Sequence, residues 1–261
     1  MNRFSDKVVL ITGTASGLGR EAALRFAAEG AVIAGADIAA AGNTETAKLV
    51  VAAGGTMYTG DAVDLTDESS VAAWINGAVA ELGGIDVLYA NAGATKFAPL
   101  QDTSLDEWQW VLKNELDLVF LPVKHSWAAL KESRGSVVLV GSTAGVSGSM
   151  TNTRIAHSTT KGGVIALAKQ LAAEGAVHGV RVNAVSPGMV RTPATENDLL
   201  ADDHPMRNIA KAIPLQRIGT PQEVINCVLF LASQDASYVT GQNLMVDGGW
   251  SSVLPGYGVV Q

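Results

Sequence analysis

Short apolar runs alternate along this chain with longer segments of helical periodicity, and this pattern constrains the fold more than any other feature. Most of the runs are apolar throughout, which is typical of strands covered on both faces. Strands that alternate with helices form parallel sheets through right-handed crossovers. The predicted strands span 8–11, 32–34, 56–58, 87–89, 136–140, 180–185 and 244–246, and the predicted helices span 17–28, 43–53, 67–82, 105–131, 158–178 and 221–233. The sequence therefore predicts an α/β fold, a doubly wound parallel sheet of about seven strands with helices on both faces.

No feature of the chain divides it into domains. Its 261 residues, 48% of them hydrophobic, can bury a large core, and they contain no repeat, low-complexity tract or linker. We therefore expect a single domain over 1–261. The least regular stretch, 188–214, holds three prolines and follows a predicted strand end, where open α/β sheets bind ligands. We expect a substrate lid there, and a purely structural loop is the alternative.

Charge and composition exclude several classes of partner. The net charge is −7 and no run of Lys or Arg occurs, so the sequence offers no basic surface that would bind nucleic acid or an anionic membrane. No apolar stretch approaches the length of a membrane span, which favours a cytoplasmic protein that acts on small molecules. The lone Cys227 excludes an internal disulfide, and no spacing of His, Cys, Asp and Glu suits a zinc site. We expect no metal.

A glycine-rich turn follows the first predicted strand. Gly13, Gly17 and Gly19 stand between the apolar run 8–11 and the helical pattern that begins near Gly17. Such a turn lets bare backbone approach a pyrophosphate, and the helix N-terminus offers unpaired N–H groups and partial positive charge. The spacing Gly-x-x-x-Gly-x-Gly differs from the best known dinucleotide fingerprint. The turn nevertheless predicts a phosphate cradle.

An acidic residue, Asp37, ends the second predicted strand. It follows the glycines by roughly twenty residues, where a carboxylate can accept hydrogen bonds from ribose hydroxyls. A carboxylate there repels a 2′-phosphate, and the next four residues, 38–41, contain no Arg or Lys to offer a counter-charge. These features favour NAD over NADP. The alternative at this point is a glycine-containing turn with a solvated Asp.

Motifs at the ends of the later strands resemble the short-chain dehydrogenase/reductase family. Asn91-Ala92-Gly93 follows the fourth strand, Gly141-Ser142-Thr143-Ala144-Gly145 the fifth, Ser186-Pro187-Gly188 the sixth, and Val246-Asp247-Gly248-Gly249 belongs to the seventh. With the glycine turn, they occur in the family's order over essentially the whole chain. The resemblance implies a Rossmann-like oxidoreductase that uses a nicotinamide cofactor.

The family pattern assigns cofactor contacts to residues of this sequence. It implies a pyrophosphate turn, a ribose anchor at Asp37, an adenine-binding acid at Asp64, a ribose-lining Asn-Ala-Gly motif, a ribose-binding lysine and a carboxamide-binding loop. For Asp64 a helix-capping acid is the alternative. The implied cofactor residues are Gly13, Ser16, Gly17, Leu18, Gly19, Asp37, Asp64, Leu65, Asn91, Ala92, Gly93, Lys161, Pro187, Gly188, Val190 and Thr192.

The family's catalytic group is only partly matched. Asn114 fits the helix Asn that steadies a proton-relay water, Ser142 the hydroxyl that polarises the substrate oxygen, and Lys161 the lysine that lowers the pKa of the proton donor. The family places a tyrosine four residues before that lysine, and this chain has His157 there. The resemblance therefore implies catalytic residues Asn114, Ser142, Lys161 and, if anything acts as proton donor or acceptor, His157.

Three hypotheses for His157 stay open from the sequence. The imidazole takes over proton transfer, directly or through a water, because histidine changes charge near neutral pH. Alternatively the cofactor site persists with weak or no turnover, as in an NAD-binding regulatory protein. Finally, a Tyr-to-His substitution at 157 silences an ordinary enzyme. The first and third make the chain an NAD-dependent oxidoreductase for a secondary alcohol or ketone, and the family resemblance also implies a homotetramer.

Overall fold

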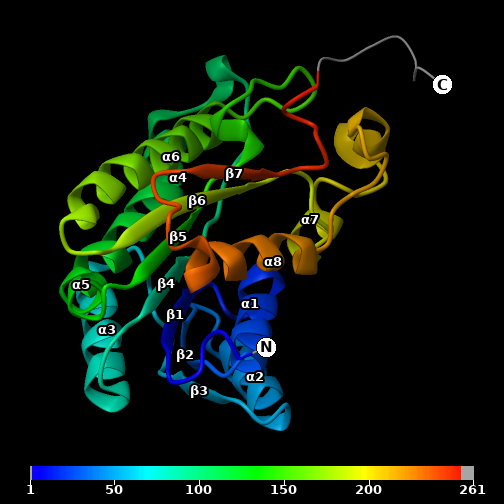
Figure 1. The fold of residues 1–261 in the computed structure, drawn as a ribbon. Coiled ribbons are helices and arrows are strands. Elements are labelled where there is room, and N and C mark those ends of the chain that lie inside the picture. Colours follow the sequence, from blue (N-terminus) through cyan, green and yellow to red (C-terminus); the bar gives the residue numbers. More distant parts are fainter. Residues whose placement is uncertain (1, 254–261) are drawn as a thin grey trace.

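The computed structural model describes residues 2–253 and contains a seven-stranded parallel sheet (Figure 1). Its order is β3-β2-β1-β4-β5-β6-β7, so the chain starts near the centre and winds first to one edge and then to the other. This confirms the predicted fold class, a doubly wound, Rossmann-like sheet. The strands are β1 (Val8–Thr12), β2 (Val32–Ala36), β3 (Thr56–Thr59), β4 (Val87–Ala90), β5 (Ser136–Val140), β6 (Arg181–Pro187) and β7 (Asn243–Val246). The domain expected over 1–261 includes position 1 and 254–261, which lie outside the described residues.

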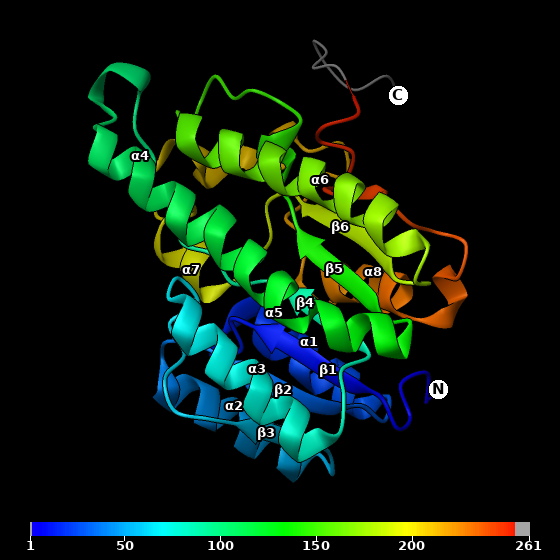
Figure 2. The same ribbon diagram turned by 90° about the vertical axis from the view of Figure 1, so that its left-hand side faces the viewer.

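Helices cover both faces of the sheet, as Figures 1 and 2 show. One face carries α3, α5 and α6, and the other carries α1 and α8, with α2 beside α1. The helices are α1 (Gly17–Ala28), α2 (Ala40–Ala52), α3 (Glu68–Leu82), α4 (Leu105–Leu112), α5 (Leu118–Ser133), α6 (Ile155–Ala176), α7 (Pro193–Asn197) and α8 (Pro221–Ala232). None of the helices within 2–253 is long and apolar enough to cross a membrane.

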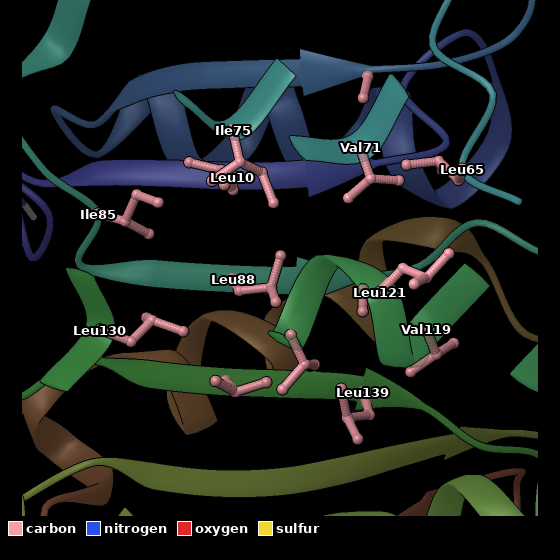
Figure 3. Close-up of a cluster of buried hydrophobic side chains, with 14 of the residues drawn as sticks. Leu10, Leu65, Val71, Ile75, Ile85, Leu88, Val119, Leu121, Leu130 and Leu139 are labelled. Atoms are coloured by element: carbon pink, nitrogen blue, oxygen red, sulfur yellow. The ribbon is translucent and has the colours of Figure 1, made fainter. Parts of the chain in front are cut away.

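The two faces of the sheet have separate apolar cores because successive strand residues point to opposite sides. On β1, Leu10 packs with α3 and α5, while Val9 and Ile11 pack with α1 and α8. Figure 3 shows the first of these cores, where Ile75 of α3 and Leu130 of α5 lie against the strands. All five residues of β1 are buried. The continuous apolar runs of the sequence thus follow from burial on both faces.

The predicted helix 105–131 is not continuous, and the prediction is corrected here. Ser104 caps α4 by accepting a hydrogen bond from the backbone N–H of Glu107 (3.1 Å). A π-helical turn, η2 (Lys113–Asp117), then separates α4 from α5. A π turn adds one residue inside a continuous helical segment, and periodicity does not resolve a single added residue, so the pattern predicts one helix. Helices α2 and α6 begin at Ala40 and Ile155, earlier than predicted.

The N-terminus of α8 carries a capping box in which Thr220 and Glu223 bond reciprocally. Glu223 accepts hydrogen bonds from Arg217 (2.6 and 2.9 Å) and from the Thr220 backbone N–H (2.8 Å), and these hold the pKa of Glu223 at about 2. Because the folded pKa is depressed, the stabilisation is present above pH ~4.5 and is lost as pH falls towards 2. We expect Glu223→Gln to lower the free energy of unfolding by about 1 kcal/mol at pH 7. Urea unfolding at pH 7 and pH 2.5 tests this, and an equal loss at both pH values contradicts it.

Candidate functional site

The glycine turn after β1 forms a concave backbone cradle. Gly13 has a φ of +77°, and a Cβ at this position would lie 2.9 Å from Asn91 Nδ2. A Cβ on Gly19 would lie 1.9 Å from the Gly13 carbonyl oxygen. Ser16, the N-cap of α1, makes no capping hydrogen bond through its side chain. Bare backbone at the N-terminus of a twelve-residue helix fits the pyrophosphate of a dinucleotide.

Thr12 joins the ends of β1 and β4 at the point where the winding of the sheet reverses. Its hydroxyl accepts hydrogen bonds from the backbone N–H groups of Asn91 (2.9 Å) and Ala92 (3.0 Å). The Asn91 side chain donates in return to the Thr12 carbonyl (3.0 Å). Ligands bind α/β sheets at such a switch point. The Asn91-Ala92-Gly93 motif therefore forms a fixed wall of the candidate site.

Asp37 holds the glycine turn against the end of β2. Its carboxylate accepts from the backbone N–H groups of Ala15 (2.9 Å) and Ala39 (2.9 Å). The second acid, Asp64, accepts from the backbone N–H and hydroxyl of Thr66 (2.8 and 2.7 Å). Asp64 does not cap α3, because that helix begins at Glu68 and its N-cap is Asp67. The helix-capping alternative for Asp64 is therefore wrong.

A cavity of about 350 Å³ connects these elements. The predicted cofactor residues that line it are Gly13, Ser16, Gly17, Leu18, Asp37, Asp64, Leu65, Asn91, Ala92, Gly93 and Thr192, and Asn114 lines it too. Gly19, Lys161, Pro187, Gly188 and Val190 are not among its lining residues. Of the described residues that line it, two are aspartates and none is Lys or Arg. Among residues 2–253, no group of three or more His, Cys, Asp or Glu side chains could hold a metal ion.

Lys161 brings a buried positive charge to the edge of this cavity. Its Nζ donates to the Val140 carbonyl at the end of β5 (3.1 Å), and a Cβ on Gly93 would lie 3.8 Å from Nζ. Burial lowers the pKa of Lys161, and the Glu115 carboxylate 3.9 Å away opposes that shift. The ammonium thus lies between the ends of β4 and β5, next to the cavity wall.

Ser142 follows β5 by two residues and is the N-cap of the 3₁₀ turn η3 (Thr143–Gly145). Its hydroxyl oxygen accepts from the backbone N–H of Ala144 (3.1 Å) and the residue is half-buried. A Cβ on Gly145 would lie 2.7 Å from the carbonyl carbon of Lys161, so this turn packs directly against α6. The absence of a side chain at 145 is what lets η3 pack against the Lys161 turn of α6.

His157 stands one turn before Lys161 on α6, and its side chain is 15% exposed. The edge of the ring meets Phe97, with centroids 5.7 Å apart and an interplanar angle of 85°. Its Nδ1 faces the carboxylate of Glu115, 2.7 Å from Oε1. The first turn of α6 thus places His157 and Lys161 on the same side of the helix, at the carboxyl end of the sheet.

Glu115 is a site residue that the sequence analysis missed, and it follows the predicted residue Asn114 directly. The Asn114 side chain donates to the Trp110 carbonyl (2.9 Å), within its own helical segment. Its backbone carbonyl accepts from the N–H of Ala94 (3.1 Å). Glu115, not Asn114, reaches the His157 ring and the Lys161 ammonium. In the sequence, Glu115 is one of several polar residues in 113–117, and its partner lies 42 positions away.

The tyrosines of the described chain lie elsewhere. Tyr89 is fully buried, donates to Asn91 Oδ1 (3.2 Å), and has its pKa raised by burial. Tyr238 is fully exposed in the loop before β7. Tyr58 lies on β3 next to Gly77 of α3. Within residues 2–253, these tyrosines make no hydrogen bond with His157, Ser142 or Lys161.

The stretch 188–214 packs over the carboxyl end of β6. It contains α7 and the 3₁₀ helix η4 (Pro205–Ala212), and Met189, Met206, Ile209 and Ile213 form a small apolar cluster of their own. Thr192 caps α7 through a reciprocal pair with Thr195. Position 188 has no room for a larger residue, because a Cβ there would lie 2.7 Å from the Cβ of Asp247. This segment therefore has ordered secondary structure.

Comparisons with known proteins agree with this geometry. A family model described as enoyl-(acyl carrier protein) reductase matches residues 13–251. The 3-oxoacyl-(acyl-carrier-protein) reductase FabG of Thermotoga maritima is 38% identical, covering 95% of this chain and 98% of that protein. Cis-4-hydroxycyclohexanecarboxylate dehydrogenase of Sinomonas cyclohexanicum is 36% identical, covering 96% and 98%. A crystal structure of a short-chain type dehydrogenase/reductase from Mycobacterium marinum superposes with a TM-score of 0.90 at 32% identity, covering 96% and 97%.

Proposed function

We propose that this chain, which belongs to the short-chain dehydrogenase/reductase family, transfers a hydride between NAD and a secondary alcohol or ketone. Family membership implies a nicotinamide cofactor, and NAD is our proposal. The observation that carries it is the cavity itself, which runs from the glycine cradle past Asp37 to Gly93, beside the Lys161 ammonium. We propose that a dinucleotide lies in this cavity with its reactive ring at the end nearest Lys161.

The charge of the cavity supports NAD over NADP. Among the described residues that line it, only Asp37 and Asp64 are charged, so a 2′-phosphate near the ribose would meet negative charge without a basic partner there. Arg20, the nearby cation on α1, is engaged by Glu45 (3.2 Å) and by the Thr46 hydroxyl (2.9 Å). The ribose hydroxyls of NAD, in contrast, can donate to the Asp37 carboxylate.

We expect Asp37→Asn to reduce the preference for NAD over NADP, measured as the ratio of kcat/KM values, at least about tenfold. The amide removes the charge that repels a 2′-phosphate while keeping an acceptor oxygen near Ala15. The exposed Asp61, which does not line the cavity, provides the matched control Asp61→Asn. An unchanged ratio in Asp37→Asn, or an equal change in both variants, contradicts this assignment.

The catalytic roles follow from the same proposal. The Ser142 hydroxyl holds the substrate oxygen, and Lys161 binds the nicotinamide ribose and contributes positive charge. We also assign Asn114 to the catalytic residues. Its backbone carbonyl accepts the hydrogen bond from the N–H of Ala94 at the cavity wall. His157 stands where the family has its tyrosine, and we propose that its imidazole accepts the proton of the alcohol. Bound NAD supplies the hydride acceptor, and the protein supplies orientation and proton transfer.

The rest of the proposal concerns the whole molecule. We propose that 1–261 forms one domain, that 188–214 acts as a substrate lid, and that the protein is a cytoplasmic homotetramer. The mass in solution tests the oligomeric state.

Cis-4-hydroxycyclohexanecarboxylate dehydrogenase acts on a ring alcohol that bears a carboxylate, so cyclic secondary alcohols with and without a carboxylate are our first candidate substrates.

Turnover separates this function from its main rival, a regulatory protein that binds NAD without using it. Both bind NADH, so binding alone does not distinguish them. We expect NADH to form from NAD and at least one secondary alcohol of the panel, at a rate that scales with enzyme concentration. Binding of NADH without turnover on any alcohol or corresponding ketone favours the regulatory protein.

A further inference from the structure

The carboxylate of Glu115 is buried beside His157 and has no part in the roles proposed above. Its side chain is 3% exposed, and it lies in the π-helical turn η2 between α4 and α5. A buried carboxylate is unfavourable unless it is paired and hydrogen-bonded. The groups that contact the Glu115 carboxylate therefore indicate its role.

Three donors surround this carboxylate. His157 Nδ1 lies 2.7 Å from Oε1 and 3.0 Å from Oε2, and the Thr160 hydroxyl donates to Oε2 (2.6 Å). Lys161 Nζ lies 3.9 Å from Oε1. An ionised carboxylate only accepts hydrogen bonds, so each neighbour matches it as a donor. The arrangement fits a charged Glu115 paired with the Lys161 ammonium.

The same contact determines the tautomer of His157. With Nδ1 donating to the carboxylate, a neutral imidazole carries its proton on Nδ1 and leaves a lone pair on Nε2. Within residues 2–253, Nε2 of His157 makes no hydrogen bond with a protein group. Other cations on the surrounding elements are engaged elsewhere: Arg154 donates to the Ser147 carbonyl (3.4 Å) and Lys96 lies over the Trp110 ring (4.9 Å).

We infer that Glu115 and His157 form a carboxylate–imidazole dyad, in which Glu115 is a positioning residue that makes Nε2 of His157 a base. The inference rests on the proposed function. As the alcohol is oxidised, its O–H bond breaks and the proton moves to Nε2, while the hydride leaves carbon with its electron pair for the bound NAD and the C=O bond forms. Glu115 stabilises the imidazolium that results, and the proton then passes to solvent. The dyad does with a carboxylate and an imidazole what a tyrosine would otherwise do.

The tautomer can be measured without substrate or cofactor. We would record ¹H–¹⁵N correlations of the histidine rings over a pH series for the ligand-free protein, and assign His157 by the loss of its signals in His157→Asn. We expect the neutral ring in the unmodified protein to carry its proton on Nδ1. A ring protonated on Nε2 overturns the inference, and this result needs no variant of Glu115 that folds.

The substitution Glu115→Gln tests the carboxylate itself. We expect Nδ1 protonation to give way to a mixture or to the Nε2 tautomer, and kcat to fall about 10²- to 10⁴-fold. The matched control is Glu68→Gln, because Glu68 contacts His125 (3.1 Å) on the exposed surface. This control should change the His125 signals and leave kcat unchanged. A His157 tautomer that is unaffected in folded Glu115→Gln overturns the dyad.

The two proposals fail in different ways. A protein that oxidises no alcohol, yet keeps Nδ1-protonated His157 under control of Glu115, contradicts the proposed function and keeps the dyad. A protein that oxidises alcohols at an unchanged rate after Glu115→Gln contradicts the dyad and keeps the proposed function.

Discussion

Replacing His157 by phenylalanine is expected to lower kcat for alcohol oxidation by about 10²- to 10⁴-fold, the contribution of a positioned general base. Phenylalanine keeps an aromatic ring against Phe97 but offers no nitrogen to accept the proton. Glu115 keeps Thr160 and Lys161 as its partners, so its buried negative charge remains paired with the Lys161 ammonium. Steady-state kinetics with saturating NAD and alcohol provide the measurement.

A second substitution separates the loss of the base from the loss of packing. His157→Asn places an amide that can still donate to Glu115 but has no basic atom at the position of Nε2. We expect it to be as slow as His157→Phe, with NADH affinity close to that of the unmodified protein. Turnover that survives in both variants shows that the proton leaves by another route, and the assignment of His157 then fails.

Alanine at position 19 should have the largest effect on the cofactor cradle. Its Cβ would lie 1.9 Å from the Gly13 carbonyl oxygen, which is backbone, and 2.9 Å from Asn91 Nδ2, which is held by its hydrogen bond to the Thr12 carbonyl. The overlap must displace the turn after β1. We expect Gly19→Ala to lower the free energy of unfolding by about 3 kcal/mol and to weaken NADH binding at least about tenfold.

Gly84 provides the control for this prediction. A Cβ at Gly84 would meet nothing within 4 Å, and its φ lies outside the left-handed region. Gly84→Ala should therefore leave both the unfolding free energy and NADH binding nearly unchanged. Denaturant unfolding and NADH fluorescence titration measure the two quantities. Normal NADH affinity in Gly19→Ala would mean that the cradle does not hold the pyrophosphate.

The sheet was predictable from the sequence because both of its faces are buried. Strand β5 has the predicted bounds 136–140, and all five of its residues are buried. Its apolar run therefore has no competing interpretation. Helix α1 also has its predicted bounds, since the glycine turn marks its start. In contrast, α6 begins at Ile155 without a side-chain cap, so no signal marked its first residue.

The interior of the site was less predictable, and Asn114 and Glu115 show why. Neighbouring residues of a helix point about 100° apart, so which polar side chain faces inward depends on the register of the helix. The π turn η2 changes that register within the segment itself. The partner of Glu115 is His157, which joins it only when α6 packs against η2. Local sequence patterns contain no information about that contact.

Residues that line the cavity were easier to predict than the contacts around His157 for a related reason. The glycine turn, Asp37 and the Asn91 motif each lie at a strand end, which a short local sequence specifies. Gly19, Gly188 and Val190 were named from the same motifs, yet they do not line the cavity. Gly19 is needed instead for the close approach of α1 to the turn.

The most direct test of the central claim, that His157 accepts the alcohol proton, is the pH dependence of NADH formation by this protein beside its His157→Tyr variant. We predict turnover by the unmodified protein that rises with pH, because only a neutral imidazole can accept the alcohol proton. The variant should be slower, because the buried Glu115 carboxylate disfavours a phenolate beside it. Turnover by the tyrosine variant alone would contradict the account and identify an ordinary dehydrogenase silenced at residue 157.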